Sequence, residues 1–328
     1  MSNSSAIEMI DTIELPPAGT KQRIQLRFSH PMLAEWSWPA TLIRGAHDGP
    51  RIAIISGVHP TEYPAIEANI RLARHIGPAS LHGAIVSLPL IDVPAFLPRS
   101  PFVCPIDQKN PNRFFPGDAN GTFTEVMNDA IFRAVIRPSD ALIDLHGGDL
   151  VEALAPFTIY SVTGNERMDA ASEAMGLAMG LSYLIANRPK PGVLGGTTIQ
   201  AAAEAGIPAI LPEAGSCGLL TETETALLID GVENVLRHLG LLSEPVKPMS
   251  SVTRITEFTW LFAPAEGLWY PAVEVGNTVR KDQPLGRIAS IFGDDVAGVT
   301  APHDGDVLFM TTSPAMREAG VLLAIGGH

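Results

Sequence analysis

The fold of this chain is decided by residues 51–62, which read RIAIISGVHPTE. The first half is an apolar, β-branched run that ends in glycine, which is typical of a buried strand. Apolar residues then recur at helical spacing through residues 65–76, so the pattern predicts a strand followed by a helix. His59 falls in the connecting loop and Glu62 at the start of that helix, where the neighbouring prolines are tolerated.

The same alternation continues along the chain. Further strands are expected at residues 84–90, 141–145, 157–162, 181–185 and 208–211, after short strands at 23–28 and 40–44. Helices are expected at residues 122–136, 166–179, 197–205 and 222–240. Strands that alternate with helices predict an α/β fold with a mostly parallel or mixed sheet.

The pattern changes at residues 242–248, where two prolines in four residues predict a linker. Beyond it, the sequence predicts a small all-β module with strands at 254–260, 267–270, 284–288, 306–310 and 321–325. We therefore expect an α/β catalytic domain over residues 1–245, with a β segment over 1–50, and a β domain over residues 250–328.

The composition excludes several classes of protein. With 328 residues, 46% of them hydrophobic and 17% charged, the chain is long and apolar enough for a large core. A net charge of −13 disfavours nucleic acid and anionic membrane surfaces as partners. Two cysteines provide no disulfide framework, and neither a signal peptide nor a transmembrane run is visible. A cytoplasmic location is expected.

His59, Glu62 and His146 form the pattern with the most chemical information. A close His/Glu pair and a distant His are a typical ligand set of catalytic zinc, because they leave one position for water. Glu213 follows another strand and is the candidate general base. His59, His146 and Glu213 follow predicted strands, and the carboxyl ends of strands in α/β sheets are where ligands bind.

Simpler interpretations exist for each residue alone. A histidine after a strand is often only hydrogen-bonded, and a glutamate in a first helical turn favours the helix dipole. The combination of four such residues favours one site. Asp144 shares a strand face with His146, so it either accepts a proton from that ring or makes a hydrogen bond at the strand end.

Four motifs, read together, resemble the succinylglutamate desuccinylase/aspartoacylase family of the zinc carboxypeptidase-like fold. They are GVHPTE at 57–62, NRFFPG at 112–117, DLH at 144–146 and EAG at 213–215. The resemblance runs over residues 45–240 and is greatest to deacylases of N-acylated amino acids, including N-acetyl-diaminobutyrate deacetylases. It implies that the His/Glu/His set binds one zinc ion and that Glu213 activates water.

The resemblance also implies that Asn112 and Arg113 contact a substrate carboxylate, which a planar guanidinium suits. A surface salt bridge is the simpler role for Arg113. The chain departs from the family where Pro60 replaces a usual glycine and where residues 107–113 read DQKNPNR. Phe102 stands where many members have an arginine that polarises the scissile carbonyl, and Arg99 is the nearby substitute.

The C-terminal residues 271–305 resemble a biotinyl/lipoyl-type barrel-sandwich module. The turn at 292–295 reads FGDD and lacks the lysine that carrier modules need, so carrier chemistry is not expected. In this family such a β module is expected to cover the active-site mouth or to support contacts in a homo-oligomer.

Together these observations predict a zinc-dependent hydrolase that removes the acyl group from an N-acylated amino acid. A metallocarboxypeptidase acting on short peptides is an alternative with the same fold and metal. A non-catalytic binding protein on this fold is a second alternative. A decayed enzyme usually loses a ligand or its base, and here all four positions are occupied.

Overall fold

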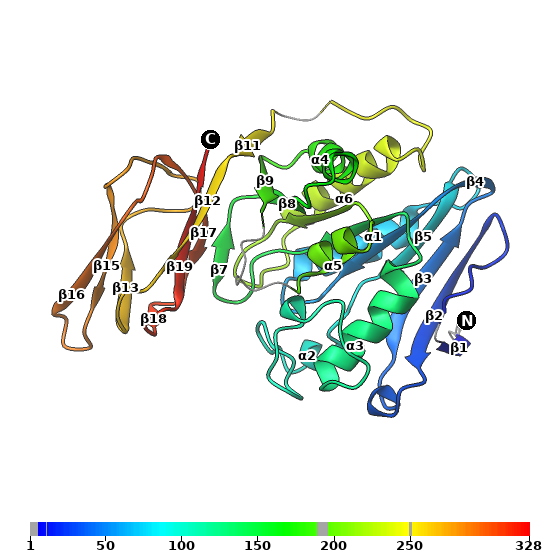
Figure 1. Ribbon diagram of the computed structural model, residues 1–328, viewed down its shortest axis with the longest axis horizontal. Coiled ribbons are helices and arrows are strands. Elements are labelled where there is room, and N and C mark those ends of the chain that lie inside the picture. Colours follow the sequence, from blue (N-terminus) through cyan, green and yellow to red (C-terminus); the bar gives the residue numbers. More distant parts are fainter. Residues whose placement is uncertain (1–5, 11, 189–195, 249–250) are drawn as a thin grey trace.

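The computed structural model describes residues 6–10, 12–188, 196–248 and 251–328. Its main body is a ten-stranded mixed sheet with the strand order β1-β2-β3-β5-β4-β6-β10-β8-β9-β11 (Figure 1). The strands are β1 (Ala6–Ile10), β2 (Thr20–Phe28), β3 (Trp38–Arg44), β4 (His47–Ser56), β5 (His82–Leu88), β6 (Ala141–Leu145), β8 (Phe157–Ser161), β9 (Tyr183–Asn187), β10 (Ala209–Glu213) and β11 (Thr253–Ile255). The predicted α/β class is confirmed.

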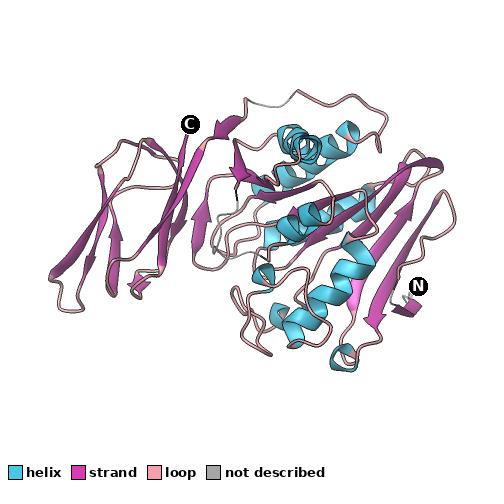
Figure 2. Cartoon of the chain, in the orientation of Figure 1, coloured by secondary structure: helices cyan, strands magenta, loops and turns pink. Residues whose placement is uncertain are grey.

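Helices cover both faces of this sheet (Figure 2). They are α1 (Tyr63–His75), α2 (Val93–Phe96), α3 (Phe123–Ile131), α4 (Glu166–Met179), α5 (Thr198–Glu204) and α6 (Glu222–His238), with short turns η1 (Pro31–Leu33), η2 (Pro111–Arg113) and η3 (Phe132–Ile136).

Strand β4 shows how the two helical layers are packed. Ala53 and Ile55 join the core formed with α3 and α5, whereas Ile52 and Ile54 join the core formed with α1, α4 and α6. Successive side chains of a strand point to opposite faces, so a strand covered on both sides is apolar throughout. This explains why residues 51–56 form an unbroken apolar run.

The C-terminal region is a sandwich of two antiparallel sheets. One holds β12 (Glu257–Phe262), β14 (Thr278–Val279), β17 (Gly305–Thr311), β19 (Val321–Gly327) and, on β17, β7 (Glu152–Leu154). The other holds β13 (Gly267–Pro271), β15 (Pro284–Ala289), β16 (Asp295–Thr300) and β18 (Ala315–Met316). Trp269, Leu285 and Ile325 lie in the core between them. The expected small all-β module is therefore present.

The two parts of the molecule exchange strands. Strand β7 lies between β6 and β8 in the chain but pairs with β17 of the sandwich. Strand β11 lies beyond the linker but pairs with β9 of the large sheet. The single strand predicted at 254–260 is therefore wrong, because the chain leaves one sheet at Thr256 and enters the other. The predicted boundary between two domains at residues 245–250 stays a prediction. Strands β7 and β11 each pair with a strand on the other side of that boundary.

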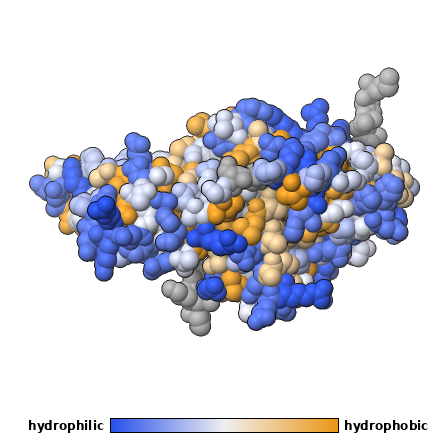
Figure 3. Space-filling model, turned by 90° about the horizontal axis from the view of Figure 1, so that it is seen from above, coloured by the Kyte–Doolittle hydropathy of each residue, from blue (hydrophilic) through white to orange (hydrophobic). Residues whose placement is uncertain are grey.

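The surface is mixed in character. Seen from above, hydrophilic residues cover much of both ends, and apolar residues gather mainly near the middle, where polar residues interrupt them (Figure 3). Within the described part of the chain, no helix combines the length and the apolar character needed to span a bilayer.

Candidate metal centre

Three adjacent parallel strands end at one edge of the large sheet. His59 follows β4, His146 follows β6, and Glu213 is the last residue of β10. The ladder continues past the strand ends, since His146 N donates to Pro212 O at 2.9 Å and Ala214 N donates to His146 O at 3.2 Å. Neighbouring residues in a parallel register point to the same face, so His146 and Glu213 present their side chains to a common space.

A sharp turn after β4 directs His59 toward this edge. Gly57 has a φ of +64°, and a Cβ there would meet the backbone of Leu90 at 3.0 Å, so glycine is required. Behind the turn, the buried side chain of Asn69 donates to Ile54 O and Leu88 O at 3.2 and 3.1 Å. Strands β4 and β5 are therefore joined to α1, the helix that begins beside Glu62, which is its N-cap residue.

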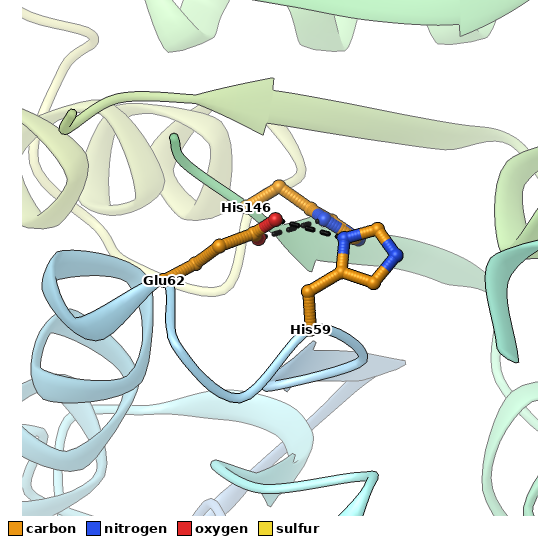
Figure 4. A group of neighbouring side chains, drawn as sticks. All are labelled: His59, Glu62 and His146. Atoms are coloured by element: carbon orange, nitrogen blue, oxygen red, sulfur yellow. Dashed lines mark hydrogen bonds and ion pairs between the residues drawn. The ribbon is translucent and has the colours of Figure 1, made fainter. Parts of the chain in front are cut away.

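The carboxylate of Glu62 lies between two imidazole rings (Figure 4). Its Oε1 is 2.8 Å from His59 Nδ1, and its Oε2 is 2.9 Å from His146 Nδ1. Each residue offers one donor atom within 4.8 Å of the others. All three residues are at most 9% exposed. The structure thus brings the three predicted ligands together.

The remaining ring nitrogens have partners that suit metal binding. His59 Nε2 lies 3.0 Å from Asn110 Oδ1, and His146 Nε2 lies 3.1 Å from Asp144 Oδ2. An oxygen acceptor at Nε2 holds the proton there and leaves Nδ1 as a lone-pair donor, the state in which imidazole binds a metal. Of the two open roles for Asp144, its carboxylate makes the contact with the imidazole; it also accepts from Thr198 Oγ1.

The pKa shifts in this cluster favour a carboxylate at Glu62 and an added positive charge at the imidazoles. Burial opposes ionisation, yet His146 and His59 lower the pKa of Glu62 to about 2. Burial also disfavours charged imidazole, yet Asp144 and Glu62 raise the pKa of His146 well above its ordinary value. Negative charge therefore retains protons at positions that a divalent cation would occupy instead. Two imidazoles and one carboxylate fit zinc, whose catalytic sites use three protein ligands.

Glu213 lies beside the cluster in an environment that favours its neutral form. Burial raises its pKa well above the ordinary value, His146 opposes this shift, and Glu62 and Glu152 add to it. A carboxyl group with a raised pKa can both take and return a proton near neutral pH. This is the property required of the predicted general base.

The two residues predicted to bind substrate differ in their surroundings. Asn112 is buried, and its side-chain Oδ1 accepts from Thr198 N at 3.0 Å, so it supports the loop. Arg113 is exposed, and its Nη1 donates to Asn112 O at 2.6 Å. The pKa of Arg113 is lowered because protein atoms shield its guanidinium from water, and the negative charges of Glu152 and Glu213 only partly oppose this shift. The charge of Arg113 therefore interacts with the carboxylates of Glu152 and Glu213, although its side chain is exposed to solvent.

The region expected to polarise the substrate carbonyl holds an aromatic ring. Phe102 packs edge-on against His59, with ring centroids 6.2 Å apart. Arg99 is exposed, and its side chain makes no hydrogen bond or ion pair with any residue the structure describes. The role of Arg99 at the site stays a prediction.

Asp149 and Glu152 at this edge were missed by the sequence reasoning. Asp149 is fully buried; its Oδ1 accepts from Thr61 Oγ1 at 2.5 Å and its Oδ2 from Phe102 N at 3.1 Å. Glu152 begins β7, and burial together with Glu62 raises its pKa to about 7. Their position just after the DLHGG motif at residues 144–148 was the available signal.

The buried carboxyl group of Asp92 makes the stability of the folded protein depend on pH. It is fully buried, and burial raises its pKa to about 7, which a weak contact from the Cys104 thiol only partly offsets. In the unfolded chain the pKa is about 4, so the folded state binds the extra proton between about pH 4 and pH 7. The contribution of Asp92 to stability is therefore present at low pH and lost as pH rises through 7.

We expect the free energy of unfolding to fall about 2–3 kcal/mol more between about pH 5 and pH 8 in the wild type than in Asp92→Asn. Urea unfolding of both proteins at both pH values measures this difference. The contributions of the other titrating groups cancel because the wild type and the variant share them. Parallel curves for the two proteins would contradict the buried-acid assignment.

The comparisons with known proteins agree with this geometry. Residues 48–239 match the model of the succinylglutamate desuccinylase/aspartoacylase catalytic domain. The chain is 26% identical over 294 residues to N-α-acetyl-L-2,4-diaminobutyric acid deacetylase of Halomonas elongata, covering 88% of this chain and 84% of that one.

Two solved structures share the fold. The product-bound ectoine utilization protein EutE (DoeB) of Ruegeria pomeroyi has a TM-score of 0.86 at 24% identity. A succinylglutamate desuccinylase/aspartoacylase of Rhodobacter sphaeroides has a TM-score of 0.82 at 22% identity. Each match covers 97% of this chain and 98% of the other.

A mixed sheet between helical layers, with a His/Glu/His set at its strand ends, defines the class of α/β proteins with a candidate metal site. Within that class, the chain belongs to the succinylglutamate desuccinylase/aspartoacylase family, because the family model matches more than half of its length. The predicted family membership is confirmed. The members named above are deacylating hydrolases.

Proposed function

We propose that this protein is a zinc-dependent hydrolase that removes the acyl group from an N-acylated amino acid. The observation that carries the proposal is the convergence of His59, Glu62 and His146 with Glu213 at one sheet edge. Its relatives support the substrate class, since one is named a deacetylase of an N-acetylated amino acid and another a desuccinylase.

In this proposal His59, Glu62 and His146 hold one zinc ion per chain. The bound zinc supplies a Lewis acid and lowers the pKa of water to about 7. Glu213 takes the proton of the attacking water and later gives it to the leaving amine. Arg113 binds the α-carboxylate of the substrate together with Asn112, which also holds the loop that carries Arg113. The products are a carboxylate and a free amino acid.

The metallocarboxypeptidase alternative shares the fold and the donor set. The names of the relatives favour the deacylase, because they describe small acylated amino acids. The non-catalytic alternative is disfavoured by the retained set of three donors and by Glu213, whose raised pKa suits proton transfer. A homo-oligomeric assembly and a cytoplasmic location stay predictions.

The direct test is turnover by the purified protein on a panel that varies acyl chain, amino acid and peptide length. We expect N-acyl amino acids to be hydrolysed and peptides of several residues to be ignored. Chelation is expected to lower kcat at least ~100-fold, and added zinc to restore it, since the metal provides several kcal/mol of stabilisation. Activity on peptides alone, or activity unaffected by complete metal removal, would overturn the proposal.

A further inference from the structure

A cavity of about 590 Å³ lies at the edge of the large sheet opposite the candidate metal centre. Strand β8 runs antiparallel to β10 and begins at Phe157, which pairs with Glu213, so its last residue, Ser161, lies at the far edge. The end of β8, the start of α4 and the end of α5 bound the cavity. Its volume is in the range of small-molecule binding sites.

Ser161 leaves a buried hydroxyl group without a partner at this cavity. The residue lines the cavity and is 3% exposed, and its Oγ has no hydrogen-bond partner among the residues the structure describes. Alternate side chains of a strand share a face, so Ser161 points with Ile159 toward the core on the α5 side of the sheet. A buried hydroxyl without a partner costs free energy, and a ligand that bonds to it removes that cost.

The charge around the cavity disfavours ionic ligands. Among the described residues that line it there is no lysine, arginine or histidine to bind an anion. The carboxylate of Glu204 at its mouth is exposed and already accepts from Gln200 Nε2 at 2.9 Å, so it repels anions and attracts a cation only weakly. A neutral ligand is therefore favoured.

The polar and apolar groups of the cavity match a molecule that carries several hydroxyl groups. A hydroxyl both donates and accepts hydrogen bonds, as do the hydroxyl of Ser161 and the carboxamides of Asn165 and Gln200. Met168 and Ala203 contribute apolar surface beside them, which suits the C–H face of a sugar ring.

Helix α5 connects this cavity to the candidate metal centre. Its first residue, Thr198, donates from N to Asn112 Oδ1 at 3.0 Å and from Oγ1 to Asp144 Oδ2. The same Asp144 oxygen lies 3.1 Å from His146 Nε2. A ligand that packs against Gln200, less than one turn further along α5, therefore contacts the helix that supports a candidate metal ligand.

We propose that this cavity is a second binding site, which takes a neutral, hydroxyl-rich small molecule and alters metal affinity through α5. Ser161 bonds one hydroxyl of the ligand, and the carboxamides of Asn165 and Gln200 bond others. The binding itself is independent of the proposed function, and only the effect on the metal rests on it. By linkage, the ligand and the metal change each other's affinity by the same factor.

Isothermal titration calorimetry with D-glucose, maltose and myo-inositol as probes tests the site. We expect saturable binding of at least one of these probes to the wild type, and no binding of inorganic phosphate. Ser161→Ala is expected to weaken the binding about tenfold, since one hydrogen bond is lost. The same change is expected to raise the Tm of the ligand-free protein, because it removes a buried hydroxyl that has no partner.

Two further variants keep the test independent of Ser161. Ser80→Ala, at an exposed serine between α1 and β5, is the matched control and is expected to keep the wild-type affinity and Tm. Ala203→Met extends a side chain into the cavity and is expected to abolish binding. Probe affinity is also expected to differ at least ~5-fold between the metal-free and the zinc-loaded protein.

Each part of the proposal has its own contradicting result. Absence of saturable binding for every neutral probe, or equal binding by Ala203→Met and the wild type, would overturn the site. Binding of phosphate instead would overturn the ligand class, and a lower Tm in Ser161→Ala would assign its hydroxyl a structural role. Equal affinity with and without zinc would overturn the effect on the metal. A protein that binds no zinc would overturn the proposed function, while sugar binding would still be measured.

Discussion

Replacing Glu213 with glutamine is expected to lower kcat at least ~100-fold while the metal stays bound. Glutamine keeps the size and the hydrogen-bonding reach of the side chain but cannot take a proton. Glu213 is not among the three converging donors, so metal affinity does not depend on it directly. Because burial and Glu62 raise the pKa of Glu213, wild-type kcat/KM is expected to rise with pH as this carboxyl loses its proton.

Steady-state kinetics and metal analysis of the same preparation measure the two quantities together. Glu204→Gln is a suitable control, because Glu204 is an exposed glutamate of α5 whose side chain accepts a hydrogen bond from Gln200. It is expected to behave as the wild type. Near-normal turnover in Glu213→Gln would remove Glu213 from the mechanism.

Replacing His146 with alanine is expected to remove metal and activity together. The variant lacks one of three donors and leaves the fully buried Asp144 without the imidazole that its Oδ2 contacts at 3.1 Å. Loss of one donor leaves a two-residue set, and metal affinity then drops by far more than the 10–100-fold typical of removing an outer partner. Activity should fall to the background of the uncatalysed reaction.

Metal content after dialysis and thermal unfolding should be recorded on the same sample, because the buried carboxylate also destabilises the variant. His238→Ala removes an exposed imidazole at the end of α6 and is expected to retain both metal and activity. Full metal occupancy in a folded His146→Ala protein would refute its assignment as a ligand.

The sequence was informative wherever burial imposed a strong pattern. Strand β6 and helix α4 have the predicted bounds. Strand β6 is buried at every position up to His146, and α4 begins after its N-cap Asn165 and ends at Gly180, which adopts the left-handed conformation. The order of strands along the chain also placed His59, His146 and Glu213 at strand ends. Their convergence then follows from parallel pairing of β4, β6 and β10.

The hydrophobic pattern of the sequence could not predict very short strands or which strands pair with each other. Strands β7, β14 and β18 have two or three residues, too few to show alternation, and they exist because a neighbouring strand offers free hydrogen-bonding groups. Strand β16 was missed since its residues are mostly exposed. Glu152 was missed because it lies in the three-residue strand β7, and its position at the site depends on the pairing of β7 with β17.

The exchange of β7 and β11 also bears on how the protein can be divided. A fragment ending before residue 250 would lack β11, which pairs with β9, and β17, which pairs with β7. Strand β7, which carries Glu152, would then have no paired strand to hold it in place. The reciprocal fragment would expose an unpaired edge along β17. Recombining halves from distant relatives would therefore require that both crossing strands match their new hosts.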